Sequence, residues 1–148
     1  MREVFADTAY WIGLINPQDD LYRLAKEISA QLGSFRIVTS EMVLAEVLNA
    51  LADYGPHIRA FGTKTVRSIV ESASIDVEPQ TRVLFREALK LYGERPDKDW
   101  SLTDCASFVI MARRGINEAL TSDAHYRMVT RHCCVPSQHR FTSALPSS

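Results

Sequence analysis

The hydrophobic positions of this chain follow two alternating periods. Short runs rich in β-branched and aromatic residues predict strands at residues 2–6, 35–39, 75–77 and 119–121. Between them, apolar residues recur at helical spacing and predict helices over residues 8–15, 18–33, 41–53, 57–73, 81–92 and 101–114. Past residue 123 we expect a short helix through Met128 and then a last strand after Pro136.

Polar and glycine residues mark where several of these helices begin and end. Ser40 and Ser101 each precede an apolar helical pattern, and serine is a favoured N-cap. Gly33 and Gly115 follow such patterns, as a glycine C-cap does. Gly62 lies within the 57–73 segment and weakens the helical pattern there.

Strands that alternate with helices predict an α/β fold with a mostly parallel sheet. The length of 148 residues fits a single domain over residues 1–148, with a loose tail after about residue 144. In such sheets ligands bind beyond the carboxyl ends of the strands. Asp7 and Asp123 each follow a predicted strand, so both are expected at that edge.

Charge and cysteine content narrow the functional classes only slightly. The formal net charge of −1 does not require a polyanionic partner. Five arginines lie in the C-terminal third, either as a weak nucleic-acid footprint or as ordinary solvated surface: Arg113, Arg114, Arg127, Arg131 and Arg140. Three cysteines without a spaced framework indicate a reducing compartment, and no apolar run reaches membrane-spanning length or forms a signal peptide. We therefore expect a cytoplasmic protein with no membrane association.

Five carboxylates occupy positions that make them candidates for catalysis or metal binding. Asp7 and Asp123 follow strands, Asp104 opens the helix that starts near residue 101, Asp99 stands just before that helix, and Glu46 lies in mid-helix. Asp7 and Asp123 are also explained as N-caps, and Asp104 as the third residue of a capping box with Ser101.

Glu46 has no such capping explanation. It lies at the edge of an apolar helical stripe, between Val43 and Asn49 at three-residue spacing. A glutamate at the edge of that stripe either points to solvent or is paired or metal-bound, because burying an unpaired charge is costly.

Taken together, these acids indicate a metal site. Carboxylates that converge at strand ends repel one another unless a divalent cation neutralises them. An all-oxygen ligand set suits Mg²⁺ or Mn²⁺. Such a site supports metal-assisted hydrolysis of a phosphodiester bond. The sequence offers no Ser–His–Asp or Cys–His arrangement and no glycine-rich phosphate loop in competition.

Four motifs resemble the acidic motifs of PIN-domain ribonucleases, and of VapC-like toxins in particular: Phe-Ala-Asp-Thr at residues 5–8, Ala-Glu-Val-Leu-Asn at 45–49, Asp-Trp-Ser-Leu-Thr-Asp-Cys at 99–105, and Leu-Thr-Ser-Asp at 120–123. The resemblance covers residues 1 to about 130. It implies a three-layer α/β/α sandwich and a Mg²⁺- or Mn²⁺-dependent endoribonuclease. It carries over Asp7, Glu46, Asp104 and Asp123 as metal ligands, with Asp99 as a further acidic position whose role is open.

The resemblance also implies partners. A VapC-like toxin cleaves RNA, is paired with an antitoxin and commonly forms a homodimer. The helices around Tyr10–Trp11 and Leu21–Ile28 are candidate dimer surfaces, or else they simply pack on the sheet. After residue 126 the chain departs from the usual family ending, which leaves the last strand open.

Two other functional classes compete with the ribonuclease. One is a PIN scaffold with little catalysis that acts mainly as a protein-binding partner. The other is a receiver-like signalling domain, which also carries acids at strand ends. The receiver reading fits badly, because it requires an acidic pair near the first strand and a lysine on the last, and no lysine follows Lys98.

Overall fold

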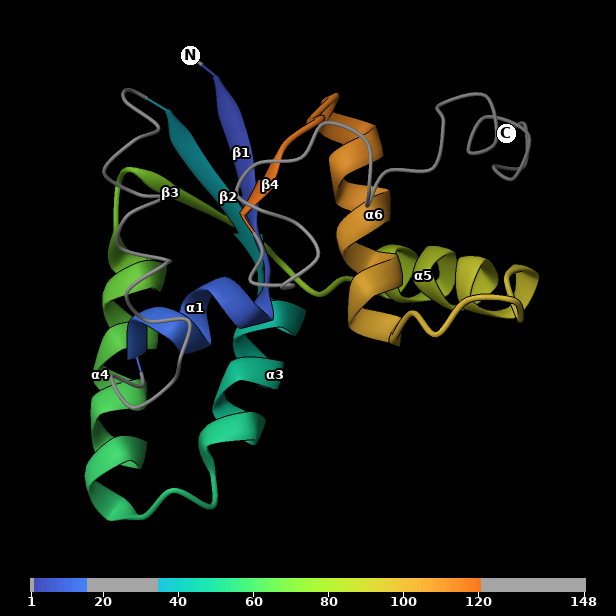
Figure 1. Cartoon of the computed structure of the whole chain (residues 1–148). Coiled ribbons are helices and arrows are strands. Elements are labelled where there is room, and N and C mark those ends of the chain that lie inside the picture. The colour runs from blue at the N-terminus through green and yellow to red at the C-terminus, as the bar shows by residue number, and fades with distance from the viewer. Residues whose placement is uncertain (1, 16–34, 121–148) are drawn as a thin grey trace.

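The computed structural model describes residues 2–15 and 35–120 of the chain (Figure 1). In chain order the elements are β1 (Glu3–Ala6), α1 (Thr8–Ile15), β2 (Arg36–Ser40), α3 (Glu41–Leu51), α4 (Pro56–Glu71), β3 (Ile75–Glu78), α5 (Arg82–Glu94), α6 (Leu102–Arg114) and β4 (Ala119–Leu120). The strands and helices predicted within these ranges are confirmed.

The four strands form one parallel sheet in the order β3-β2-β1-β4. Phe5 of β1 pairs with Val38 of β2 on one side and with Ala119 of β4 on the other. Because all strands run the same way, their carboxyl ends meet at one edge of the sheet. The α/β class and the parallel sheet expected from the sequence are confirmed.

Helices cover both faces of the sheet, which gives the three-layer sandwich (Figure 1). On one face, Trp11 of α1 donates a hydrogen bond from its indole nitrogen to Thr39 of β2. On the other, Arg114 of α6 reaches Glu3 of β1 and Asp76 of β3. Asp76 pairs with Val38, the residue before Thr39, so Thr39 and Asp76 point to opposite faces of the sheet. α4 lies with α1, and α5 lies against α6 (Figure 1).

The apolar stripes read from the sequence form the core. Val43 and Val47 of α3 are fully buried, as are Phe5 and Val38 in the middle of the sheet. Tyr10 and Trp11 are also buried, and every residue of α1 is at least half-buried. α1 therefore packs within the fold, against α3 and α4 and, through Trp11, on β2, and its role as a dimer surface stays a prediction.

The helix ends follow the predicted signals. The Ser40 side chain accepts a hydrogen bond from the Val43 backbone N–H and caps α3. Gly115 ends α6 in the left-handed region, with φ of 67°. α4 is a regular helix of 16 residues, despite its weak pattern. A Cβ on Gly62 would stand 3.2 Å from Leu51 Cδ1, so glycine permits the close approach of α3 and α4 here.

An ion-pair network, which we call the Arg114 cluster, ties the end of α6 to the sheet. Its members are Arg114, Arg36, Glu3, Asp76 and Glu78. Hydrogen bonds from Arg36 and Arg114 hold the pKa of Asp76 below its usual range. Burial acts to lower the pKa of Arg114, but hydrogen bonds to Glu78 and Asp76 raise it overall.

Some predictions fall outside the described residues: the helix over residues 18–33 with its candidate dimer surface, the short helix after Asp123, the last strand and the loose tail. Within residues 2–15 and 35–120, no helix has both the length and the apolar character that crossing a membrane requires.

Candidate active site

Asp7 lies where β1 passes into α1, at the carboxyl edge of the sheet. Its Oδ1 atom accepts a hydrogen bond of 3.0 Å from the Tyr10 backbone N–H, so it caps α1 as one reading of the sequence proposed. Its own backbone N–H donates to the carbonyl oxygen of Leu120, the last residue of β4, at 3.2 Å. Asp7 is half-buried. Its position is thus set from both its backbone and its side chain.

A buried polar chain supports the backbone next to Asp7. The Trp11 indole N–H donates to Thr39 Oγ1 at 3.1 Å, and the Thr39 hydroxyl donates to the carbonyl oxygen of Ala6 at 2.9 Å. Thr39 is fully buried. The hydrophobic pattern alone does not single out this residue; the available signal is a threonine inside the apolar run of β2.

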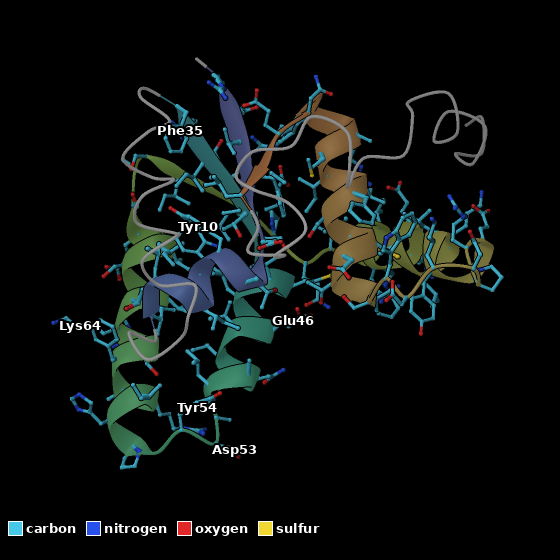
Figure 2. The ribbon with its side chains drawn as sticks, viewed as in Figure 1. Tyr10, Phe35, Glu46, Asp53, Tyr54 and Lys64 are labelled. Carbon is cyan, nitrogen blue, oxygen red and sulfur yellow. The ribbon has the colours of Figure 1, made fainter. Side chains whose placement is uncertain are left out.

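Glu46 lies in the second turn of α3, the helix that leaves the carboxyl end of β2. It is half-buried, whereas the neighbouring Val43 and Val47 are fully buried. Figure 2 shows Glu46 on the side of α3 that faces the start of α6. Across the described ranges Glu46 forms no hydrogen bond or ion pair, so its carboxylate is available to a ligand.

Asp104 lies in the first turn of α6 and forms the predicted capping box. Its Oδ2 atom accepts from the Ser101 backbone N–H at 2.9 Å, while its own backbone N–H donates to Ser101 Oγ at 3.0 Å. The cap uses only one carboxylate oxygen of the half-buried Asp104. Beside it, burial raises the pKa of the Cys105 thiol to about 11, and the negative charge of Asp104 contributes. Cys105 is therefore an inert core residue, as predicted.

The fold brings three of the predicted acids to one end of the molecule. Asp7 follows β1, and Glu46 lies on α3, the helix that follows β2. Asp104 lies in the first turn of α6, which packs against α3. Asp99 is exposed, and Asp123 lies outside the described residues. In the part of the chain that the structure describes, no three carboxylate, histidine or cysteine side chains are close enough together to hold a metal ion.

Two arginines of the predicted basic region are engaged within the chain. Arg114 belongs to the Arg114 cluster, and Arg113 pairs with Glu87 of α5. The other three arginines of that region lie beyond residue 120, outside the described residues.

The comparison with protein families is decisive. The model of the PIN domain family matches residues 4–131, which is most of the chain. This chain belongs to the PIN domain family. The fold agrees, because PIN domains place a parallel sheet between helices, as the resemblance implied.

Individual relatives agree with the PIN assignment. The 23S rRNA-specific endonuclease VapC20 of Mycobacterium tuberculosis, from strains CDC 1551 / Oshkosh and H37Rv, is 28% identical over 123 residues, covering 83% of this chain and 91% of the relative. The crystal structure of M. tuberculosis VapC20, a sarcin-ricin loop cleaving toxin, superposes with a TM-score of 0.73 at 26% identity. It covers 82% of this PIN domain and 90% of VapC20.

Proposed function

We propose that this PIN domain is a metal-dependent endoribonuclease that hydrolyses RNA phosphodiester bonds and acts as the toxin of a type II toxin–antitoxin pair. The observation that carries the proposal is the placement of Asp7, Glu46 and Asp104 at the carboxyl end of a parallel sheet in a PIN domain. The similarity to VapC20, which is named as a 23S rRNA-specific endonuclease, supports the same substrate class.

The donor chemistry at this end of the sheet fits a hard divalent cation. Asp7, Glu46 and Asp104 offer only carboxylate oxygens, and Asp123 would add a fourth acid, with Asp99 as a further candidate. Mg²⁺ and Mn²⁺ prefer such ligands and retain several waters. When bound, the cation would polarise a phosphoryl oxygen and lower the pKa of a water.

The chain's own residues would prepare this site. The α1 cap at Tyr10 and the Thr39 hydrogen bonds fix the backbone around Asp7. The Ser101 capping box fixes Asp104. Glu46, which has no partner in the described ranges, would complete the ligand set or orient the attacking water. Pre-positioned groups of this kind need little rearrangement at the moment of reaction.

The proposed partners follow from the same function. RNA is the substrate, and the protein would work in the cytoplasm, where that substrate is found. A cognate antitoxin would block the site, for example with an arginine among the carboxylates. A homodimer is the proposed assembly.

Cleavage of a labelled RNA hairpin carrying the sarcin-ricin loop, the target named for VapC20, tests this function. We expect cleavage with Mg²⁺ or Mn²⁺ and none with EDTA. Asp7→Asn and Asp104→Asn should each lower the rate by more than about 100-fold. Asp53→Asn is the matched control, because Asp53 is exposed at the end of α3 that is far from the sheet (Figure 2). Equal RNA cleavage by wild type and both site variants would instead favour the scaffold alternative.

Growth tests address the toxin role separately. Expression should arrest growth in a host cell, and the product of a neighbouring gene should relieve the arrest. Asp7→Asn should remove the arrest without lowering the protein level. Arrest that persists in the Asp7→Asn variant would contradict a toxin that acts by cleavage.

A further inference from the structure

The loop between α5 and α6 holds two cations over one aromatic ring. The Lys98 backbone N–H donates to the carbonyl oxygen of Arg95 at 3.1 Å, which closes a tight turn. Arg95 Cζ lies 5.2 Å from the centroid of the Trp100 ring, and Lys98 Nζ lies 5.8 Å from it. At these distances the negative face of an indole attracts a cation. The ring thus restrains two long side chains that would otherwise be flexible.

The Trp100 ring is itself anchored on α6. It packs edge-on against the ring of Phe108, with the two centroids 4.8 Å apart and an angle of 71° between the planes. Phe108 is almost fully buried, whereas Trp100 is half-buried. One part of the indole therefore belongs to the packing of α6, while another part faces solvent with the cations.

This ring lies next to one of the candidate metal ligands. Trp100 directly precedes Ser101, whose backbone N–H donates to Asp104 Oδ2 at 2.9 Å. Phe108 follows Asp104 by four residues, so the two side chains share one face of α6. In Figure 1 the loop leads from the outer end of α5 back to the start of α6. The cations on the ring are therefore held at the end of α6 that carries Asp104.

The two cations differ in their compensation. Arg95 donates from Nε to Asp97 Oδ1 and from a terminal nitrogen to Asp97 Oδ2, both at 2.9 Å. These hydrogen bonds lower the pKa of Asp97 to about 2, so the pair stays charged and mutually neutralised. Lys98 is exposed and forms no ion pair with a residue in the described ranges. Its positive charge is thus available to an anion from outside the chain.

We propose that Lys98, held in place by Trp100, binds an RNA phosphate next to the cleaved bond, an inference that rests on the proposed ribonuclease function. RNA that reaches Asp104 passes the loop that precedes α6. The acids of the site repel this polyanion, and a fixed cation beside them offsets the repulsion. A phosphate contact of this kind positions the strand without reading its sequence. Trp100 is a positioning residue, because restraining the lysine beforehand reduces the side-chain entropy lost on binding.

RNA affinity in EDTA, measured on the full chain by fluorescence anisotropy over a salt series, tests the proposal apart from cleavage. Lys98→Gln should bind a labelled single-stranded RNA about fivefold more weakly, with the slope of log K against log salt shallower by about 0.7 for one lost phosphate contact. Lys98→Arg keeps the charge and should stay within about twofold of wild type. The matched control is Lys64→Gln, which removes the same charge from exposed α4, on the far side from Glu46 (Figure 2). It should change affinity by less than about twofold.

Variants of Trp100 test the positioning role. Trp100→Phe keeps an aromatic face and should bind RNA within about twofold of wild type, whereas Trp100→Leu should lose about threefold. Adding Lys98→Gln to Trp100→Leu should then cost less than about twofold more, because the lysine is no longer held. If Lys98→Gln still costs about fivefold without the ring, Trp100 is only structural and the positioning role is overturned. Should Trp100→Leu fail to fold, Trp100→Phe and the exposed lysine variants still decide the proposal.

The remaining outcomes separate this inference from the ribonuclease proposal. The inference is overturned if Lys98→Gln and Lys64→Gln weaken RNA binding equally, or if neither weakens it. It is also overturned if Lys98→Gln changes self-association in sedimentation while RNA affinity stays the same, because the loop then contacts a second copy. If Lys98→Gln loses RNA affinity but wild type shows no metal-dependent cleavage, only the ribonuclease proposal fails.

Discussion

The backbone N–H of Asp7 donates a hydrogen bond to the carbonyl oxygen of Leu120 at a distance of 3.2 Å. This bond continues the β1–β4 ladder one residue past the last paired residues, Ala6 and Leu120. Asp7, the first of the predicted site acids, therefore lies beside the point from which the chain leads to Asp123. A metal site that combines Asp7 with Asp123 depends on this contact between β1 and β4.

Thr39→Val tests the hydrogen bonds that hold the backbone next to Asp7. Valine matches the shape of threonine but can neither accept from the Trp11 indole N–H nor donate to the Ala6 carbonyl oxygen. Leaving the buried indole N–H unsatisfied should cost about 2 kcal/mol in the free energy of unfolding, measured in urea. Thr39→Ser keeps the hydroxyl and should cost about 1 kcal/mol for the lost methyl group. Equal losses in the two variants would show that the hydrogen bonds contribute nothing.

Ser101→Ala should weaken the start of α6. The change removes the side-chain acceptor for the Asp104 backbone N–H, and loss of an N-cap costs about 1 kcal/mol. Ser68→Ala is the matched control, because the Ser68 hydroxyl only bonds back to Lys64 within exposed α4. That control should stay within about 0.5 kcal/mol of wild type. A Ser101→Ala protein as stable as wild type in thermal and urea unfolding would argue against the cap.

Asp76→Asn should lower stability in a pH-dependent way. Hydrogen bonds from Arg36 and Arg114 lower the pKa of Asp76 in the folded protein. A lowered pKa stabilises the fold above the ordinary value of about 3.9, and this contribution is lost as pH falls through the folded pKa. We expect a loss of about 1 kcal/mol at pH 7 that shrinks below about pH 4 in urea unfolding series. A loss that is the same at pH 7 and pH 3 would contradict the ion-pair explanation.

Gly62→Leu should separate α3 from α4. A Cβ at Gly62 would already stand 3.2 Å from Leu51 Cδ1, and Leu51 is buried. A larger side chain would force the helices apart at a cost of about 1–3 kcal/mol. Gly93→Leu in the last turn of α5 is the control, since a Cβ there meets nothing within 4 Å. If Gly62→Leu unfolds at the same urea concentration as Gly93→Leu, the contact is not tight.

Local signals account for the parts of the fold that the sequence predicts well. Ser40, Ser101 and Gly115 act within one helical turn, and the alternation of strands and helices determines the parallel sheet. The sequence pattern underestimates α4, because glycine is a poor helix former in isolation, whereas Gly62 allows close packing on α3 in the fold.

Long-range partnerships could not be predicted. The sequence does not reveal that Arg114 pairs with Glu3, Asp76 and Glu78, because these charges meet only after the sheet has formed. The same is true of Trp11 and Thr39. The position of Asp7 at the carboxyl edge is predictable because it directly follows a strand. Glu46 and Asp104 lie within helices, and only their helical positions and the resemblance to PIN-domain motifs point to them. The sequence could not show that one carboxylate oxygen of Asp104 caps α6 while the other forms no hydrogen bond with a residue in the described ranges.

Mn²⁺ binding, followed by isothermal titration calorimetry, tests the metal site most directly. We predict that wild type binds Mn²⁺ and that Glu46→Gln weakens the affinity by more than about tenfold. Asp53→Asn, in the turn beyond the far end of the same helix, should bind Mn²⁺ like wild type (Figure 2). No detectable Mn²⁺ binding by wild type, or equal affinities for the two variants, would contradict a metal site built from the acids at the carboxyl end of the sheet.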